Sequence, residues 1–194
     1  MEKKKRRFGD RKDGVLLRDL DGMHFITPLI YPNRCDNEAY ISETIDLTNM
    51  NAYLERKNAN ETEFRYTMFH VIVAALIKTI TLRPKMNRFI ANKNFYQRNE
   101  VSASFVVKKQ FADEAAEALA VIHGKDDSTL DSIHEELRHQ ILDCRDEKKV
   151  DSSTDSMNLF NSMPRFLGKF IVWILTRLDI HGWIPQSIIE TDPY

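Results

Sequence analysis

Two segments of the chain alternate between apolar and polar residues, which is the pattern of half-buried β-strands. In residues 41–47, Ile41, Ile45 and Leu47 fall on one face, with polar residues between them. Residues 101–107 alternate in the same way, with Val101 and Phe105 on the apolar side. Short extended pieces are predicted near residues 88–96, joined by a turn at "ANKN".

Other segments have the spacing of helices. Residues 48–57 predict a short helix capped by Thr48. Residues 67–82 are apolar on nearly all sides, which predicts a helix enclosed by the protein. Pro84 closes that helix, because the residue before a proline is pushed out of helical geometry.

The second half of the chain predicts further helices. Residues 113–122 are expected to form a short helix. Ser128 and Asp131 resemble a capping box, and an apolar stripe follows them. That stripe consists of Leu130, Ile133, Leu137 and Ile141. After a loop-like stretch at 146–156, a strongly apolar helix is expected from Pro164 to about Leu178.

The order of these elements sets the expected fold class. Strands and helices are mixed without a regular β-α-β rhythm, so we expect an α+β domain with helices packed on a mixed sheet. A length of 194 residues fits one domain with a sizeable core. Residues 1–14 are basic and are interpreted as a mobile terminal segment, with a lipid-contacting or nucleic-acid-contacting arm as the less favoured alternative.

Composition and charge restrict the partners. The formal net charge of −1 offers no global attraction to nucleic acid or to an anionic membrane. The longest apolar run, residues 166–175, is interrupted by Lys169 and is about half the length of a membrane span. We therefore expect a soluble, cytoplasmic protein with no nucleic-acid or membrane partner. Cys35 and Cys144 match no metal or redox spacing and are interpreted as thiols in a reducing compartment.

The histidines do not predict a metal site. His134 and His139 flank acidic residues but lie five apart, roughly 140° around a helix, whereas a zinc-protease helix needs them four apart. We interpret both as part of a solvated helix face. His70, inside the apolar helix, is expected to be a hydrogen-bonded core residue.

The series "ISETIDLTNMNAYL", "TMFHVIVAALIKTI", "RPKMNRFI" and "NFYQRNEVSASFVVKK" carries a family resemblance. It resembles the catalytic domain of the dihydrolipoamide acyltransferases of 2-oxo acid dehydrogenase complexes, and is similar to chloramphenicol acetyltransferase. The landmark positions are Pro84, Asn87, Phe89 and the run 101–107, and the resemblance covers residues 15–122 best.

The resemblance implies a chloramphenicol acetyltransferase-like fold and a coenzyme A-dependent acyltransferase. In that family a histidine acts as general base on a thiol or hydroxyl, which attacks the thioester of an acyl-CoA. A hydroxyl stabilises the oxyanion. The family's site lies between the subunits of a trimer, so the resemblance implies a homo-oligomer, coenzyme A as a substrate and a small-molecule acyl acceptor.

The catalytic residues of the family are not matched. No H-x-x-x-D-G motif occurs; the string from His123 to Asp127 has serine in place of the glycine and is interpreted as coincidental. No serine matches the oxyanion-binding hydroxyl, and His24 stands after Gly22 and Met23 where the family commonly has arginine. No catalytic, cofactor-binding or metal-binding residue is therefore assigned.

These observations leave the function open among three classes. The first is an acyltransferase domain at residues 15–194 that lacks its C-terminal part, has no lipoyl domain and is inactive as it stands. The second is an inactive assembly or binding module that keeps the fold. The third is an unrelated small-molecule-binding α+β domain. The apolar helix near residues 166–175 further predicts self-association, with a trimer expected of a longer chain.

Overall fold

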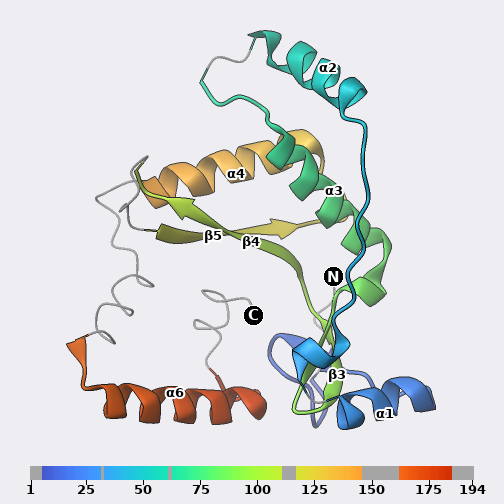
Figure 1. Ribbon diagram of the computed structural model, residues 1–194, viewed down its shortest axis with the longest axis vertical. Coiled ribbons are helices and arrows are strands. Elements are labelled where there is room, and N and C mark those ends of the chain that lie inside the picture. The colour runs from blue at the N-terminus through green and yellow to red at the C-terminus, as the bar shows by residue number, and fades with distance from the viewer. Residues whose placement is uncertain (1–5, 32, 61–62, 111–116, 146–161, 185–194) are drawn as a thin grey trace.

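The protein is an α+β structure with two small antiparallel sheets (Figure 1). The computed structural model describes residues 6–31, 33–60, 63–110, 117–145 and 162–184. The helices are α1 (Gly22–Ile30), α2 (Thr48–Lys57), α3 (Met68–Leu82), α4 (Leu130–Arg145) and α6 (Arg165–Ile180). The strands are β1 (Gly14–Leu16), β2 (Arg88–Ala91), β3 (Asn94–Arg98), β4 (Val101–Lys108) and β5 (Glu117–Gly124). The expected α+β class is confirmed, but the expected mixed sheet is wrong, because both sheets in the described ranges are antiparallel.

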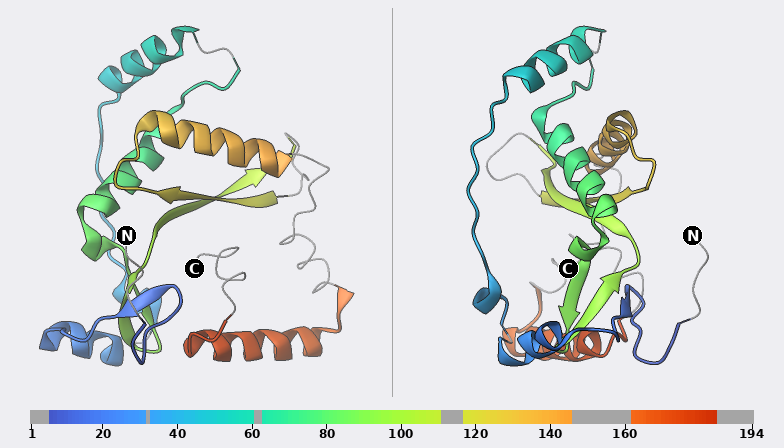
Figure 2. Two further views of the ribbon diagram at one scale, coloured as in Figure 1. Left: turned by 180° about the vertical axis from the view of Figure 1, so that it is seen from behind. Right: turned by 90° about the vertical axis from the view of Figure 1, so that its right-hand side faces the viewer.

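The hydrophobic core lies between the β4–β5 sheet and the two helices α3 and α4, which cover the same region of it (Figures 1 and 2). Its buried members come from α3, β5 and α4, and they are Val73, Ile77, Ile122, Ile133 and Leu137. Val101 and Phe105 of β4 pack against this cluster. Both belong to the apolar side that alternation predicted, so the prediction of a strand at 101–107 is confirmed.

The second sheet has the strand order β1-β3-β2. Along the chain, its strand β2 follows α3 after a short 3-10 turn. Arg83 leaves helical geometry ahead of Pro84, which opens a short 3-10 turn (Pro84–Met86), so the predicted end of the helix is confirmed. The β2–β3 turn consists of Asn92 and Lys93, which both have positive φ angles of 46° and 60°. A two-residue hairpin turn of this hand matches the twist of the strands, and it confirms the turn predicted at "ANKN".

The prediction that α3 is buried on almost every side is wrong. Of its residues only His70, Val73 and Ile77 are buried, and Val73 and Ile77 belong to the core shared with β5 and α4. Four large apolar residues of the same helix stay exposed, namely Phe69, Ile72, Leu76 and Leu82.

The predicted strand at residues 41–47 is also absent. These residues are exposed and belong to neither sheet, and Figure 1 shows the chain running as a long stretch without helix or strand up to α2. An alternating sequence of apolar and polar residues specifies which face of a strand would be apolar. The strand itself forms only where a neighbouring strand is present to pair with it. The cap of α2 differs as well, because the Asp46 carboxylate accepts from the backbone N–H of Thr48 at 2.9 Å. Thr48 is the first residue of the helix and Leu47 its N-cap position, which has no side-chain cap hydrogen bond, while Asp46 accepts from the Thr48 N–H and hydroxyl.

The expected helix at residues 113–122 is wrong for its described part, since residues 117–124 form strand β5. Ala118, Ala120 and Ile122 alternate inward and are buried against the core. The stretch "EALAVI" suits either a helix or a strand locally, and pairing with β4 along its full length selects the strand. Residues 113–116 lie outside the described ranges.

Helix α4 starts one residue later than the predicted capping box. Thr129 and Ser132 form the reciprocal pair, with the Ser132 N–H donating to Thr129 Oγ1 at 3.2 Å and the Thr129 N–H donating to Ser132 Oγ at 2.9 Å. The predicted apolar stripe is confirmed, with Ile133 and Leu137 buried.

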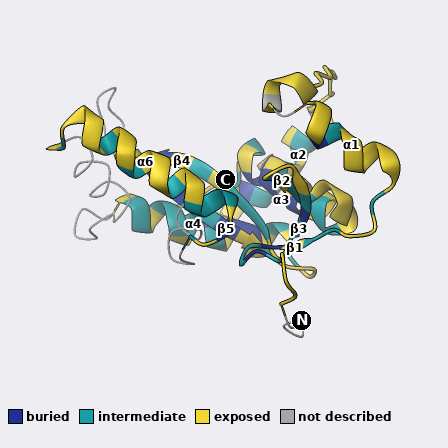
Figure 3. Ribbon diagram, turned by 90° about the horizontal axis from the view of Figure 1, so that it is seen from below, coloured by how far each residue is buried: buried dark blue, intermediate teal, exposed yellow. Residues whose placement is uncertain are grey.

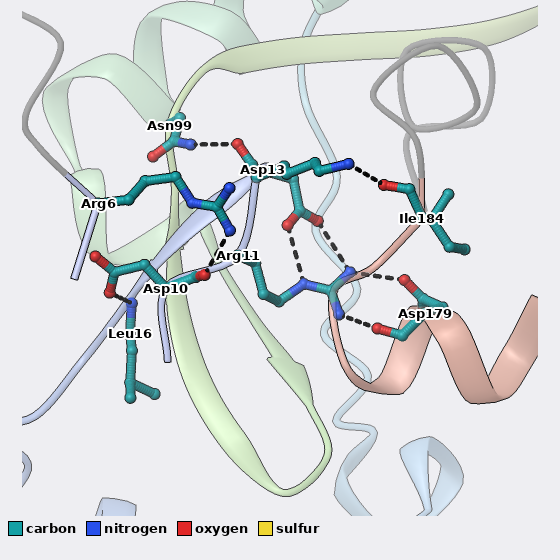
Figure 4. Close-up of polar contacts among 9 residues, drawn as sticks. Arg6, Asp10, Arg11, Asp13, Leu16, Asn99, Asp179 and Ile184 are labelled. Atoms are coloured by element: carbon teal, nitrogen blue, oxygen red, sulfur yellow. Dashed lines mark hydrogen bonds and ion pairs between the residues drawn. The ribbon is translucent and has the colours of Figure 1, made fainter. Parts of the chain in front are cut away.

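Helix α6 begins after Pro164 as predicted and is tied to the N-terminal segment at its other end. Arg11 is buried and binds Asp13 of its own segment and Asp179 of α6 (Figure 4). Lys12 Nζ donates to the backbone carbonyl of Ile184 at 2.9 Å. The loop-like stretch at 146–156 lies outside the described ranges. Over the described ranges, no helix combines the length and apolarity that crossing a bilayer requires.

Candidate functional site

Two histidines from different helices meet in the interior. His70 of α3 and His134 of α4 are 4% and 2% exposed, and their ring centroids lie 5.0 Å apart. Packing α3 beside α4 over the sheet brings the first turns of both helices together. The expectation for His70 is confirmed, because its ring is buried and hydrogen-bonded. The assignment of His134 to a solvated helix face is wrong.

Two aromatic residues from the segment before α3 complete this buried cluster of Phe64, Tyr66, His70 and His134. Tyr66 stacks on His134, with ring centroids 3.7 Å apart and planes 11° apart. Phe64 lies 5.5 Å from the His70 centroid and 5.1 Å from that of His134. The two imidazoles are therefore surrounded largely by aromatic rings.

Hydrogen bonds assign a tautomer to each histidine. The backbone N–H of Thr67 donates to Nδ1 of His70 at 3.0 Å, so a neutral His70 carries its proton on Nε2. Nε2 of His134 lies 2.8 Å from the carbonyl oxygen of Phe64, which only accepts, so His134 carries its proton there. The remaining atoms, a donor at His70 Nε2 and an acceptor at His134 Nδ1, are buried without a hydrogen-bond partner.

Burial favours the neutral form of His70 in this cluster. Desolvation by burial, followed by the neighbouring His134, lowers the pKa of His70, although the Thr67 N–H opposes the shift. A charged imidazole in this place would stand among aromatic rings and beside a second imidazole. His70 is therefore uncharged at neutral pH.

A polar group closes the solvent side of the cluster. Asp131 lies 2.6 Å from Lys57 Nζ of α2 and accepts from the Tyr66 hydroxyl at 3.0 Å. The hydrogen bonds from Lys57 and Tyr66 lower the pKa of Asp131. Burial and the hydrogen bond to Asp131 raise the pKa of Tyr66. Lys57 Nζ also lies 5.1 Å from the Tyr66 ring centroid, so this group fastens α2 to α4.

The chemistry available to the buried cluster is proton uptake by the imidazole of His70. Over the described ranges, no group of three histidine, cysteine or carboxylate side chains is placed to hold a metal ion. A sequence signal for His134 does exist, because Leu130, His134 and Leu137 follow one another at helical spacings of four and three. His134 thus belongs to the apolar stripe of α4 rather than to its solvated face.

The histidines outside this cluster lie at the surface. His139 is 73% exposed and lies 3.5 Å from Asp143, as expected of a solvated helix face. His24 lies in the first turn of α1, and its Nδ1 lies 2.6 Å from the exposed carboxylate of Asp21. The backbone N–H and then the side chain of His24 lower the pKa of Asp21. This pair caps a helix and faces solvent.

The string from His123 to Asp127 spans the end of β5 and the following turn. His123 Nδ1 lies 3.5 Å from Glu100 of the β3–β4 connection, and its backbone N–H donates to Glu136. Gly124 has a packing reason, because a Cβ there would come within 2.5 Å of Ile77 Cγ2. Structural roles thus account for the histidine and glycine of this string.

The landmark residues of the resemblance form one connected unit. The side-chain amide of Asn87 donates to the backbone carbonyl of Glu100 at 2.9 Å. The backbone carbonyl of Asn87 accepts from the backbone N–H of Arg98 at 2.9 Å. Phe89 stacks on Tyr96 within the hairpin, with ring centroids 5.3 Å apart.

Cys35 and Cys144 are both thiols.

Comparison with protein-family models, curated proteins and solved structures finds no match to this chain.

Proposed function

We propose that this chain is a domain of the coenzyme A-dependent acyltransferase type that provides scaffold and subunit contacts for an oligomer. The observation that carries the proposal is the unit running from α3 through Pro84 and the β2–β3 hairpin into β4, held together at Asn87. The resemblance rests on the same positions in the same order. The acyl transfer would run from acyl-CoA to a thiol or hydroxyl acceptor, with a trimer as the assembly.

The described residues favour a scaffold role over a catalytic one. A general base needs an accessible imidazole within hydrogen-bonding reach of its substrate. His70 and His134 are buried, and His123 lies at the surface beside Glu100. All six histidines of the chain lie in the described ranges, so the remaining residues supply no imidazole base, which favours the alternative of an inactive assembly module.

The exposed segment at residues 41–47 supplies a contact surface. Ile41 and Ile45 are 87% and 74% exposed on one face of a backbone that alternates like a strand. An exposed segment of this kind gains backbone hydrogen bonds and apolar burial by joining the edge of another sheet. β1 and β2 are the edges of the three-stranded sheet, so a second copy offers a place for it.

Sedimentation velocity over a range of protein concentrations tests the assembly. The double variant Ile41→Asp/Ile45→Asp should shift the wild-type oligomer toward the monomer, because two carboxylates would be placed on the apolar face. Ser42→Asp/Thr44→Asp is the matched control, since it adds the same charge to the opposite face of the segment. A monodisperse wild-type monomer, or equal dissociation of both variants, would contradict the proposed contact.

A further inference from the structure

In the described part of the chain, the two helices α1 and α6 at one end expose many large apolar side chains. α1 and α6 both lie along the lower end in Figures 1 and 2, and both are largely exposed when seen from below in Figure 3. None of the 16 residues of α6 is buried, and only Pro28 of α1 is buried. An exposed apolar surface of this extent marks a contact site.

The exposed face of α6 is aromatic. Phe166, Phe170 and Trp173 are 75%, 55% and 56% exposed, and their spacing of four and three residues places them on one face. The rings of Phe170 and Trp173 stack with their centroids 6.1 Å apart. Leu167 and Ile174 widen this face.

α1 adds a second apolar face without charged residues other than the titratable His24. Its exposed large side chains lie within an arc of about 160° around the helix axis and are Met23, Phe25, Ile26, Leu29 and Ile30. Pro28, on the remaining side, is turned into the protein. Both helices therefore direct apolar surface away from the fold.

The charge on α6 is basic. Arg165, Lys169 and Arg177 are all exposed, and Arg177 lies 5.6 Å from the Trp173 ring centroid. The acidic residue of the helix, Asp179, is engaged by Arg11 at 2.7 Å. The local charge of this helix thus differs in sign from the net charge of −1 of the whole chain.

The Arg11 contact also fixes the position of α6. Arg11 Nη1 donates to the backbone carbonyl of Asp179 (Figure 4). The Arg11 guanidinium also lies 5.6 Å from the Phe89 ring centroid in β2. The C-terminal end of α6 is thereby held against the three-stranded sheet. The aromatic face remains exposed in that position.

An anionic lipid surface suits this end better than a second copy of the chain. A symmetric contact between two copies would bring three cations of one α6 toward three of the other. Headgroups of anionic lipid would instead be attracted to those cations, while aromatic and aliphatic side chains enter the acyl boundary. Lysine and arginine stems allow the charged groups to remain at headgroup level.

We propose that α1 and α6 form an interfacial surface that binds anionic bilayers with both helices lying in the membrane plane. A helix of 16 residues is about 24 Å long, shorter than the roughly 30 Å hydrocarbon core, so α6 lies on the bilayer rather than across it. The inference is independent of the proposed acyltransferase scaffold and differs from the sequence-based expectation of no membrane partner. That expectation considered the net charge of the chain and the length of one apolar run.

Co-sedimentation with vesicles of phosphatidylcholine, with and without phosphatidylglycerol, tests the proposal. The full chain should bind the mixed vesicles, and Phe166→Ser/Phe170→Ser should abolish that binding. Ile72→Ser/Leu76→Ser on α3 is the matched control, because it removes two large, exposed apolar side chains away from α1 and α6 and should leave binding unchanged. Urea unfolding of each variant checks that the fold is retained.

Two double variants, each removing two positive charges, test the contribution of the basic residues of α6. Lys169→Gln/Arg177→Gln should weaken binding to mixed vesicles roughly 30-fold, since each basic residue near an anionic surface contributes roughly fivefold. Lys78→Gln/Lys85→Gln removes the same charge from exposed positions elsewhere and should have little effect. Equal weakening in both variants would overturn the assignment to α6.

Tryptophan fluorescence gives a direct readout. The chain has two tryptophans, so Trp183→Phe leaves Trp173 as the reporter. Its emission should move to shorter wavelength when mixed vesicles are added. No shift and no co-sedimentation would overturn the proposal. Self-association that Phe166→Ser/Phe170→Ser abolishes, in the absence of vesicle binding, would identify a second copy as the occupant instead.

Discussion

Nη2 of Arg11 lies 2.7 Å from Oδ1 of Asp179, although 168 residues separate the two in the chain. Burial by itself lowers the pKa of Arg11, but hydrogen bonds to Asp13 and Asp179 outweigh it and raise that pKa. The Asp13 side chain is 8% exposed and that of Asp179 is 50% exposed. One buried cation therefore serves two carboxylates in different environments.

Replacing Arg11 with methionine should lower the free energy of unfolding by about 3 kcal/mol. The substitution leaves the carboxylate of Asp13 buried without its cation, and removing one partner of a buried pair is strongly destabilising. Urea denaturation followed by circular dichroism measures the change. Asp179→Asn should cost less than about 1 kcal/mol, because that carboxylate is half exposed. Equal losses in the two variants would contradict the distinction.

Stability should fall as the pH is lowered through the range below 6.5. Because the pKa of His70 is lowered in the folded protein, the unfolded chain takes up a proton first, at its ordinary pKa near 6.5. The contribution of His70 is fully present above that value and is lost as the pH falls toward the lowered folded pKa. One proton gives a slope of at most about 1.4 kcal/mol per pH unit. Urea unfolding at pH 7.5, 6.5 and 5.5 measures it.

His70→Gln is the control for this titration. Glutamine three residues after Thr67 completes a capping box, so the backbone N–H of Thr67 keeps an acceptor while the titrating ring is removed. The variant should lose less stability than the wild type between pH 7.5 and 5.5. An identical pH profile would show that His134 or another group carries the dependence.

Alanine substitutions in α3 should separate its two sides. Val73 is 6% exposed, and Val73→Ala should cost on the order of 1–3 kcal/mol through lost burial and cavity formation. Leu76 is 52% exposed, and Leu76→Ala should cost less than about 1 kcal/mol. Thermal or urea unfolding compares them. A cost at Leu76 as large as that at Val73 would place another surface over this side of the helix.

The β2–β3 turn offers a stabilising substitution. Lys93 has a φ of 60°, where a side chain is disfavoured and glycine is not. Lys93→Gly creates the Asn-Gly pair that this hairpin turn prefers and should raise stability by about 0.5–1 kcal/mol. Lys78→Gly, inside α3, should lower stability by about 1 kcal/mol. Parallel urea titrations test whether the two glycines act in opposite directions.

Residues 1–194 should show no acetyl-CoA-dependent transfer to dihydrolipoamide or chloramphenicol. The chain has two H-x-x-x-D strings, His123 to Asp127 and His139 to Asp143, and both histidines are exposed and lie 3.5 Å from a carboxylate, of Glu100 and Asp143 respectively. A colorimetric assay of released coenzyme A thiol measures this. Turnover that His123→Ala abolishes would make His123 the catalytic base and contradict its structural assignment.

The sequence alone determined the elements whose signals are local. Pro84 ends a helix through its own ring, and the Asn92–Lys93 turn needs only two tolerated positive φ angles. The α3, α4 and α6 helices and the β4 strand follow from apolar spacing along a single segment, and the stop before Pro84 was predicted correctly. The short strands at 88–91 and 94–98 were likewise predicted from consecutive residues.

Tertiary structure decided every feature that depends on a partner distant in the sequence. Residues 117–124 became a strand because β4 pairs with them, whereas residues 41–47 have a strand pattern without a ladder. The burial of His134 depends on Phe64, 70 residues away, and that of Arg11 on Asp179. An apolar pattern specifies that a face avoids water, but the neighbour that covers it is chosen by packing across the whole chain.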